Sequence, residues 1–429
     1  MLPRVRWHRP RAAAKLAAPS RRREPLDNIS HTLAGVLLGE CLARMRGGAM
    51  PLQPRRTLVV VLAAVGSNLP DLDLLDSGWH DRLDYLLHHR GYSHSVVAAA
   101  LAGALLAVLA RGWLHWRGHR PNARDWGVIG AIALLGPLLH LALDYGNSYG
   151  VHPWWPLDNR WRYGDSLFIV EPWLWLAGTP LLATLRSRSA RTLLALALGA
   201  IVLAAAASGL ARPAVALALA GTLALLAWLA ARAPVSLALG CGLALWLGTI
   251  AAFTMAGAYA RHALRAQLPD HGLVDIVLTP LPGDPLCWEA LLVRVEDEVL
   301  VGQRALLSLA PAHVPAQSCP ARGAGSATTA PLTAVAARSD ARLQWFGQVE
   351  TPLARLRASA RRDCRAAAAL QFMRVPWLAR VAGHEVIGDL RFDREPALGF
   401  AEIGLAQPGP CPRAVPWRAP RADVLDGVR

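Results

Sequence analysis

Seven side chains of metal-binding type occur in four short segments of this chain. They are the imidazoles and carboxylates of His31, Asp71, Asp73, His89, His94, His140 and Asp144. Most of them border apolar runs, where an ionisable group is costly and usually functional. Nitrogen and oxygen donors without thiolates suit zinc, manganese or iron, and a pair of such ions can activate water for an in-line displacement at phosphorus. The set predicts a hydrolytic centre with one or two divalent ions, zinc being the first candidate.

Each segment also has a structural interpretation. His140 and Asp144 are four residues apart, so on a helix they lie one above the other and either grip a cation or tie two helices together. Asp71 and Asp73 follow a proline, as residues of a helix cap or a turn do. His31 at a helix start is typical of an interfacial or capping residue. Convergence of all these groups would favour the metal site.

The loop His89–Ser95 carries two histidines five residues apart across a glycine. Arg90 is placed to meet a phosphate or carboxylate with two hydrogen bonds, and Ser93 is placed to cap the next helix. We expect Arg90 and Ser93 to be catalytic groups beside the metal ligands. His88 is interpreted as a spare neighbour, and the alternative for the loop is an exposed polar turn.

Hydropathy predicts a mainly α, polytopic membrane protein. Hydrophobic residues make up 54% of the chain, and several apolar runs approach the roughly 18 to 20 residues that cross a hydrocarbon core. The expected spans are Thr57–Leu75, Ser95–Leu114, Trp126–Tyr145, Leu167–Leu185, Thr192–Leu210, Ala214–Leu229 and Val235–Tyr259. A shorter run, Ser30–Leu42, is expected to lie in the interface, to re-enter, or to span with strain.

Hydropathy also divides the chain near residue 261. We expect a basic disordered arm at 1–26, a helical membrane domain at 27–260 that carries the metal site, and an extramembrane domain at 261–429. Strands are expected where apolar and polar residues alternate, at Leu273–Leu278, Ala290–Val295, Glu298–Val301 and Val386–Phe392. The last domain is therefore expected to be small and α+β or mostly β, with a flexible loop at 310–333.

The net charge of +15 is interpreted as membrane topology, and no nucleic-acid partner is expected. Three loops are rich in arginine, at Arg44, Arg46, Arg55 and Arg56, at Arg111, Arg117, Arg120 and Arg124, and at Arg186, Arg188 and Arg191. The positive-inside rule makes these loops cytoplasmic, which puts the polar clusters and the C-terminal domain on the outer face of the membrane. The basic arm favours the opposite orientation if Ser30–Leu42 crosses the bilayer.

Two further segments have open interpretations. The C-terminal part contains Cys287, Cys319, Cys364 and Cys411, an even number that permits two disulfides in an oxidising compartment, with free thiols as the alternative. The segment Gly146–Asp165 is rich in tryptophan, tyrosine and arginine. It is interpreted as an interfacial belt or as a lid that holds a lipid headgroup beside the metals.

Four motifs together resemble the YdjM-type family of bacterial inner-membrane, metal-dependent hydrolases. They are Asn28–Gly35, Pro70-Asp71-x-Asp73, His89–Ser95 and His140-x-x-x-Asp144. The resemblance covers about residues 28–175, and the C-terminal part is similar to the longer, YfhP-like members. Ser93 stands where the family usually has threonine and keeps the hydroxyl. A more distant likeness is to the zinc phospholipase C and S1/P1 nuclease group, whose ligands include a helical His-x-x-x-Glu.

These features together predict a membrane-embedded hydrolase whose substrate is an amphiphilic or lipid-like ester or phosphoester. Membrane lipid is the expected partner, and the resemblance implies the bacterial inner membrane as its location. The alternative is a non-catalytic membrane protein whose soluble domain binds a partner or envelope component. A transporter is disfavoured because the run from 192 to 259 has almost no ionisable residue within its apolar cores.

Overall fold

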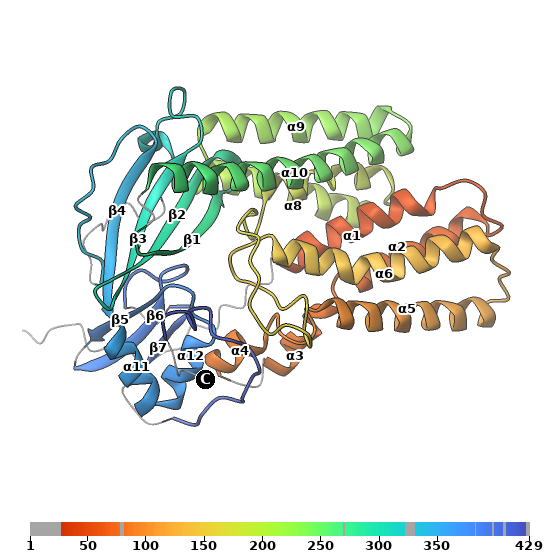
Figure 1. The fold of residues 1–429 in the computed structure, drawn as a ribbon. Coiled ribbons are helices and arrows are strands. Elements are labelled where there is room, and N and C mark those ends of the chain that lie inside the picture. The colour runs from red at the N-terminus through yellow and green to blue at the C-terminus, as the bar shows by residue number, and fades with distance from the viewer. Residues whose placement is uncertain are drawn as a thin grey trace, which may run out of the picture.

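The computed structural model describes residues 27–77, 81–268, 271–321, 331–381, 383–396, 399–405 and 409–425. The predicted basic arm at 1–26 lies outside the described residues. Long helices run side by side through one half of the molecule, and the strands and the last helices lie at one end of them (Figure 1). The mainly helical class, with small antiparallel sheets in the C-terminal part, is confirmed.

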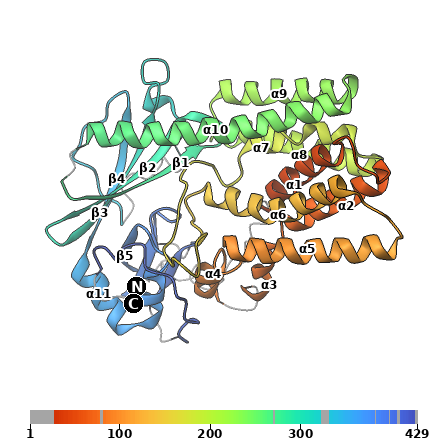
Figure 2. The same cartoon turned by 45° about the vertical axis from the view of Figure 1, so that its right-hand side comes forward.

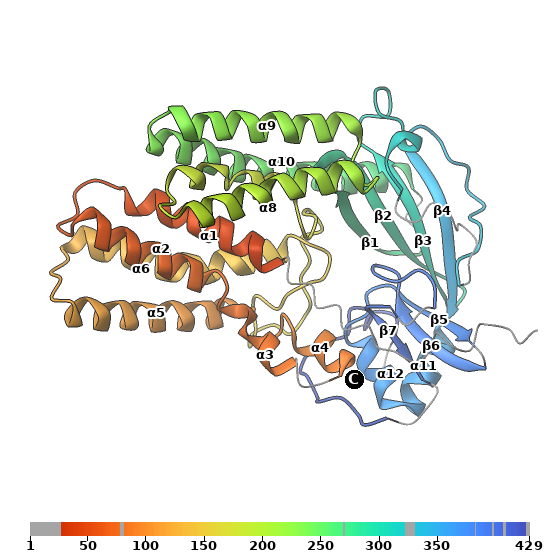
Figure 3. The same cartoon turned by 180° about the vertical axis from the view of Figure 1, so that it is seen from behind.

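The long helices form two groups (Figures 1 and 3). The first contains α1 (Asp27–Ala43), α2 (Leu52–Gly66), α5 (Val96–Trp116) and α6 (Ala123–Tyr145), and the second contains α8 (Arg188–Ala207), α9 (Pro213–Arg232) and α10 (Val235–Gln267). Within the described residues, five helices are long and apolar enough to cross a membrane, namely α5, α6, α8, α9 and α10. A sixth span results if α2 and its bent continuation to Asp76 are counted together.

The expected span Leu167–Leu185 is wrong as a single helix. It contains α7 (Pro172–Leu176) and the 3₁₀ turn η3 (Thr179–Ala183), and α7 lies between the two groups of long helices (Figure 2). The interruption follows from Pro180, which has no N–H for the carbonyl of Leu176; the hydroxyl of Thr179 donates to that carbonyl instead, at 2.6 Å. Broken helices of this kind are tolerated at membrane depth where protein buries them.

Helix α1 contains the short run Ser30–Leu42 and lies along α2. Near its start, Asn28 Nδ2 donates to Asp71 at 2.9 Å. Near its end, Glu40 accepts from Arg56 Nε at 2.9 Å. The helix thus reaches from the polar clusters to the opposite end of the bundle.

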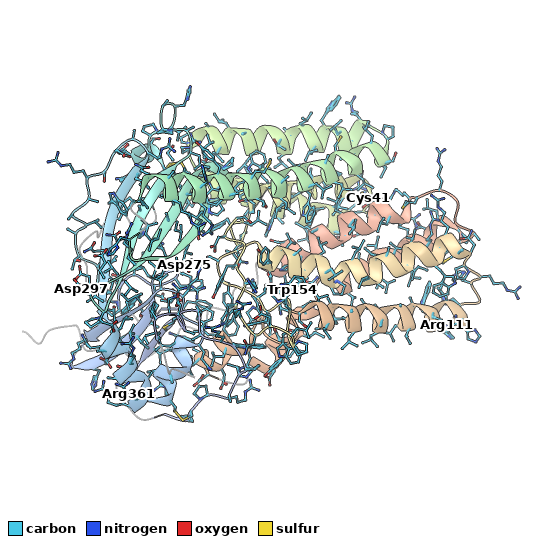
Figure 4. All side chains as sticks on the ribbon, in the orientation of Figure 1. Cys41, Arg111, Trp154, Asp275, Asp297 and Arg361 are labelled. Atoms are coloured by element: carbon cyan, nitrogen blue, oxygen red, sulfur yellow. A yellow bond between two sulfur atoms is a disulfide. The ribbon has the colours of Figure 1, made fainter. Side chains whose placement is uncertain are left out.

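The arginine-rich loops gather at that opposite end. Arg55 Nη2 donates to the carbonyl of Ala43 at 2.7 Å, and Arg56 Nη2 donates to the carbonyl of Thr184 at 2.9 Å. The label of Arg111 marks the same end of the bundle in Figure 4. The prediction that the three basic loops share one end, with the polar clusters at the other, is confirmed.

Short elements connect the long helices at the end with the polar clusters. After α2, the 3₁₀ turn η2 (Pro70–Leu72) and α3 (Asp73–Ser77) continue at an angle of 53° to α2, a bend consistent with Pro70, which cannot extend the helix. Helix α4 (Arg82–His88) follows, capped by Asp81, which accepts from the backbone N–H of Asp84.

The C-terminal part contains two antiparallel sheets. The first has the order β1 (Leu273–Leu281), β2 (Asp284–Glu296), β3 (Val299–Ser308) and β4 (Leu343–Pro352); the second has the order β5 (Pro376–Val381), β6 (His384–Asp389) and β7 (Glu402–Gly404). The turn η4 (Ala316–Ser318) and the helices α11 (Leu353–Arg362) and α12 (Cys364–Leu370) complete it. The predicted strands correspond to β1, β2, β3 and β6, although residues 390–392 follow β6 as a turn.

Two disulfides join the four cysteines of this part, Cys287 with Cys319 and Cys364 with Cys411. The aromatic segment Gly146–Asp165 packs against the same part: Trp161 Nε1 donates to the carbonyl of Gln371 at 2.7 Å. Burial between the two halves accounts for Tyr149 and Trp161, whereas Trp154 is 55% exposed and still fits the interfacial belt. Contacts of this kind hold the C-terminal part on the end of the bundle that carries the polar clusters.

Candidate metal centre

The structure brings all seven predicted ligand residues together. Helix α1 supplies His31, η2 and α3 supply Asp71 and Asp73, the loop after α4 supplies His89 and His94, and α6 supplies His140 and Asp144. His31 Nε2 lies 3.3 Å from Asp144 Oδ1, and its ring stacks on that of His140 with 3.8 Å between centroids. The convergence that the sequence interpretation required is therefore present.

Four donor atoms form the centre of the cluster. His94 Nε2 lies 3.4 Å from Asp71 Oδ1, 3.0 Å from Asp144 Oδ2 and 3.0 Å from His140 Nε2. His140 Nε2 lies 3.3 Å from Asp71 Oδ1 and 3.4 Å from Asp144 Oδ2. Zinc holds nitrogen and oxygen ligands at about 2.0–2.1 Å, which in a tetrahedron separates the ligands by about 3.3–3.4 Å. The five separations are close to such edges, so the donors fit this ion.

A second group of donors adjoins the first. Ligand atoms of Asp71, Asp73 and His89 all lie within 4.8 Å of one another, and His89 Nδ1 lies 3.1 Å from Asp73 Oδ1. Asp71 is common to both groups. A carboxylate shared in this way can bridge two ions, as the donor count predicts.

Outer contacts orient the ligands. His140 Nδ1 lies 2.8 Å from the carbonyl of Ser67, so when Nδ1 is the protonated nitrogen it donates there and leaves the lone pair of Nε2 toward the cluster. Asn28 holds the second oxygen of Asp71 at 2.9 Å. Hydrogen bonds of this kind set the tautomer and orientation of metal ligands.

Ser93 belongs to this outer layer. Its hydroxyl donates to Asp73 Oδ2 at 2.7 Å and lies 2.9 Å from His94 Nδ1. The expectation that Ser93 caps the next helix is wrong: Ser95 occupies that position, and its hydroxyl accepts from the N–H of Ala98 at 3.1 Å. The side chain of Ser93 instead contacts the two ligand residues Asp73 and His94.

Arg90 is buried next to the cluster. Its backbone has a φ of 62°, in the left-handed region, and its N–H donates to Asp73 Oδ2 at 3.1 Å. Its guanidinium contacts Asp144 Oδ1 at 2.9 Å and Asn147 Oδ1 at 2.9 Å. One oxygen of Asp144 therefore faces Arg90, while the other faces the two imidazoles.

The central donors of the cluster are buried. His94 and His140 are 0% exposed, Asp144 is 1% exposed and Asp71 is 9% exposed. Burial would lower the pKa of His94, but the carboxylates of Asp144 and Asp71 raise it well above its ordinary value. The surroundings of His94 thus stabilise positive charge at the centre of the cluster.

The last described segment of the chain covers the loop that carries the histidines. Trp417 stacks on His152 with 3.8 Å between ring centroids. A Cβ atom at Gly91 would lie only 2.9 Å from the indole ring of Trp417. Gly91 is thus required by this close approach. Arg413 Nη2 contacts Asp76 at 2.8 Å on the neighbouring α3.

Several residues that contact the site were not predicted from the sequence. Asn147, His152 and Trp417 contact the loop from far along the chain, and no local signal pointed to them. Asn28 stood within a quoted motif without a role. His88 Nδ1 lies 3.0 Å from the carbonyl of Asp84, a contact within α4, and His88 belongs to neither donor group of the described residues.

Comparison with known proteins identifies the membrane part. Residues 26–215 match the family model described as YdjM inner membrane protein. No curated protein and no solved structure matches the chain.

Proposed function

We propose that this protein, whose residues 26–215 belong to the YdjM inner membrane protein family, is a metal-dependent hydrolase. Its substrate is an ester or phosphoester of an amphiphilic molecule, reached at the membrane boundary. The observation that carries the proposal is the set of buried donors on Asp71, His94, His140 and Asp144, five of whose separations are 3.0–3.4 Å. Zinc is the first candidate, and manganese or iron are the alternatives.

The donor groups favour two ions over one. The first group has two imidazole nitrogens and two carboxylates, and the second has His89 with Asp73 and the shared Asp71. When bound, divalent ions polarise an ester or phosphoryl oxygen and lower the pKa of a water molecule.

The contacts of Arg90 and Ser93 support positioning roles in this proposal. Arg90 holds one oxygen of Asp144 and orients the other toward the imidazoles. Ser93 joins Asp73 to His94. Both residues act on ligands in this arrangement, while a direct catalytic contact with substrate stays a prediction.

We further propose that the centre and the C-terminal part face the extracytoplasmic side. The arginine-rich loops lie at the opposite end of the bundle, which the positive-inside rule makes cytoplasmic. The two disulfides of the C-terminal part also fit an oxidising compartment.

Metal content tests the proposal directly. Purified protein is reconstituted with zinc, manganese or iron, desalted and measured by mass spectrometry of the elements. The wild type is expected to retain one or two ions per chain, and His94→Ala and Asp144→Asn are expected to lose them. His88→Ala is the matched control, because His88 lies one residue from a ligand but outside both donor groups. Equal metal content in all four proteins would refute the proposal.

Activity is measured on the same samples with phosphoester and carboxylic ester lipids. Hydrolysis is expected from the wild type and His88→Ala, and not from His94→Ala or Asp144→Asn. The non-catalytic alternative predicts that cellular function survives both ligand substitutions and is lost when residues 269–429 are deleted.

A further inference from the structure

A second polar site lies outside the metal cluster, where α10 leaves the membrane part. It is a cavity of about 540 Å³. Its walls come from Tyr145 at the end of α6, the segment 163–165, the last turns of α10 and Arg374 of the C-terminal part. A cavity of this size is large enough for a phosphate group with the glycerol of a lipid.

The cavity carries more positive than negative charge. Three arginines and a histidine line it, namely Arg261, His262, Arg265 and Arg374, and the only carboxylate in its described wall is Asp165. Asp165 accepts from Arg261 Nη2 at 2.9 Å and from Arg374 Nη1 at 2.9 Å. The wall therefore keeps a surplus of positive charge, which favours an anionic ligand.

Charges behind the wall do not remove this surplus. Asp275 on β1, labelled in Figure 4, accepts from Arg374 Nε at 2.7 Å. Asp275 also lies 3.4 Å from Arg421 Nη2. The negative charge of Asp275 is therefore balanced by the positive charge of Arg421. The ion pairs hold Arg374 in place, while His262 and Arg265 stand exposed at the edge of the cavity.

The cavity lies at the depth of lipid headgroups. A helix rises about 1.5 Å per residue, so the first 20 residues of α10, from Val235 to Thr254, cover about 30 Å, the thickness of the hydrocarbon core. The wall residues of α10 begin at Thr254, the last residue of this stretch, and continue to Arg265, so most of them lie beyond the core. Tyr145, which is 45% exposed, closes α6 beside them, as aromatic residues at a membrane interface do.

The hydroxyl of Tyr163 supplies an independent sign of a ligand. It is buried and has no hydrogen-bond partner among the described residues, although buried hydroxyls normally have one in protein, water or ligand. Burial raises the pKa of Tyr163 to about 12, so the hydroxyl remains a donor near neutral pH. The guanidinium of Arg374 lies 4.1 Å from the centre of its ring.

We propose that this cavity binds the phosphate group of an anionic amphiphile. Arg265 and His262 meet the phosphate at the edge, and the Tyr163 hydroxyl donates to an oxygen deeper in the cavity. Tyr145 in its wall directly follows the ligand Asp144 in the sequence, so the end of α6 contributes to both sites. The further step, that the bound amphiphile is the substrate, rests on the proposed hydrolase function, whereas phosphate binding itself requires no metal.

Binding is measured on the full chain in nanodiscs after metal removal with EDTA. The probes are short-chain phosphatidylglycerol, short-chain phosphatidylcholine and glycerol 3-phosphate. Phosphatidylglycerol is expected to bind, and Arg265→Gln and Tyr163→Phe are each expected to weaken it about tenfold through the loss of a charge-assisted hydrogen bond. Arg111→Gln is the matched control, because it removes the same charge at the far end of α5 (Figure 4).

The outcomes distinguish a lipid headgroup from a free phosphate ester as the ligand. They also distinguish failure of the phosphate site from failure of the hydrolase proposal. Binding of phosphatidylglycerol alone identifies a lipid headgroup, and equal binding of glycerol 3-phosphate identifies a free phosphate ester. No binding of either, or equal weakening by Arg265→Gln and Arg111→Gln, overturns the phosphate site, as does unchanged binding to Tyr163→Phe. His94→Ala is expected to bind like the wild type. If it does while the wild type retains no metal, the hydrolase proposal fails and the phosphate site stands.

Discussion

The indole nitrogen of Trp417 donates a hydrogen bond to the backbone carbonyl of Leu87 at 2.7 Å. Trp417 belongs to the last described segment, and Leu87 lies in α4, two residues before the ligand His89. The bond joins residues that are 330 positions apart. The C-terminal part thus holds the turn from which the histidines of the candidate metal centre project.

Replacing Trp417 with alanine is expected to loosen this turn. A large-to-small change at a buried aromatic costs about 3–5 kcal/mol, and Trp417 is 2% exposed. We expect a lower melting temperature and weaker zinc binding, measured by thermal unfolding and by competition with a chelator. Trp116→Ala is the control, since Trp116 is 75% exposed at the end of α5. Unchanged zinc affinity in the Trp417 variant would contradict the coupling.

Substitution of Ser93 separates its hydroxyl from its size. Ser93→Ala removes the bonds to Asp73 and His94, and the loss of such an outer contact lowers metal affinity about 10- to 100-fold. Ser93→Thr keeps the hydroxyl and is expected to bind zinc like the wild type. Zinc dissociation constants of the three proteins, determined with a competing chelator, check this. Equal affinity of the alanine and threonine variants would exclude the orienting role.

The histidine beneath Trp417 makes stability depend on pH. Burial, together with the nearby charge of His94, lowers the pKa of His152 to about 3, although the carbonyl of Arg90 and the carboxylate of Asp158 oppose the shift. As the pH falls below 6.5, the unfolded chain binds a proton that the folded chain does not, so stability decreases. The loss is about 2 kcal/mol at pH 5 relative to pH 7.

Denaturant unfolding at pH 7 and pH 5 measures this effect. His152→Gln removes the titrating group, so its stability is expected to fall less than that of the wild type between the two values. A His88→Gln variant is the control and is expected to keep the wild-type slope. Parallel losses in the wild type and His152→Gln would contradict the assignment.

Accessibility of cysteines tests the orientation. In intact cells a membrane-impermeant maleimide, applied after mild reduction, is expected to label Cys364 and Cys411 if the C-terminal part is extracytoplasmic. Cells without reduction, in which the disulfide protects both thiols, provide the control. Labelling that appears only after the inner membrane is permeabilised would place this part in the cytoplasm.

The local pattern of the sequence determined the composition of the site and much of the membrane part. His140 and Asp144 share a helix face because helical periodicity is a local property. The apolar runs predicted the long helices α5, α6, α8, α9 and α10 because the transfer of side chains into lipid depends on composition. Pro180 was visible too, but hydropathy averages over a window and does not register the missing N–H that divides 167–185.

Only the tertiary structure decided how the parts meet. Asp71 serves both donor groups because α2 bends at Pro70 and packs against α6, and no spacing in the sequence records that contact. The ion pair of Arg374 with Asp165 and the hydrogen bond of Trp417 to Leu87 likewise join residues that are far apart in the sequence. Such contacts depend on the packing of whole elements, and residues brought together by packing leave no periodic signal in a single sequence.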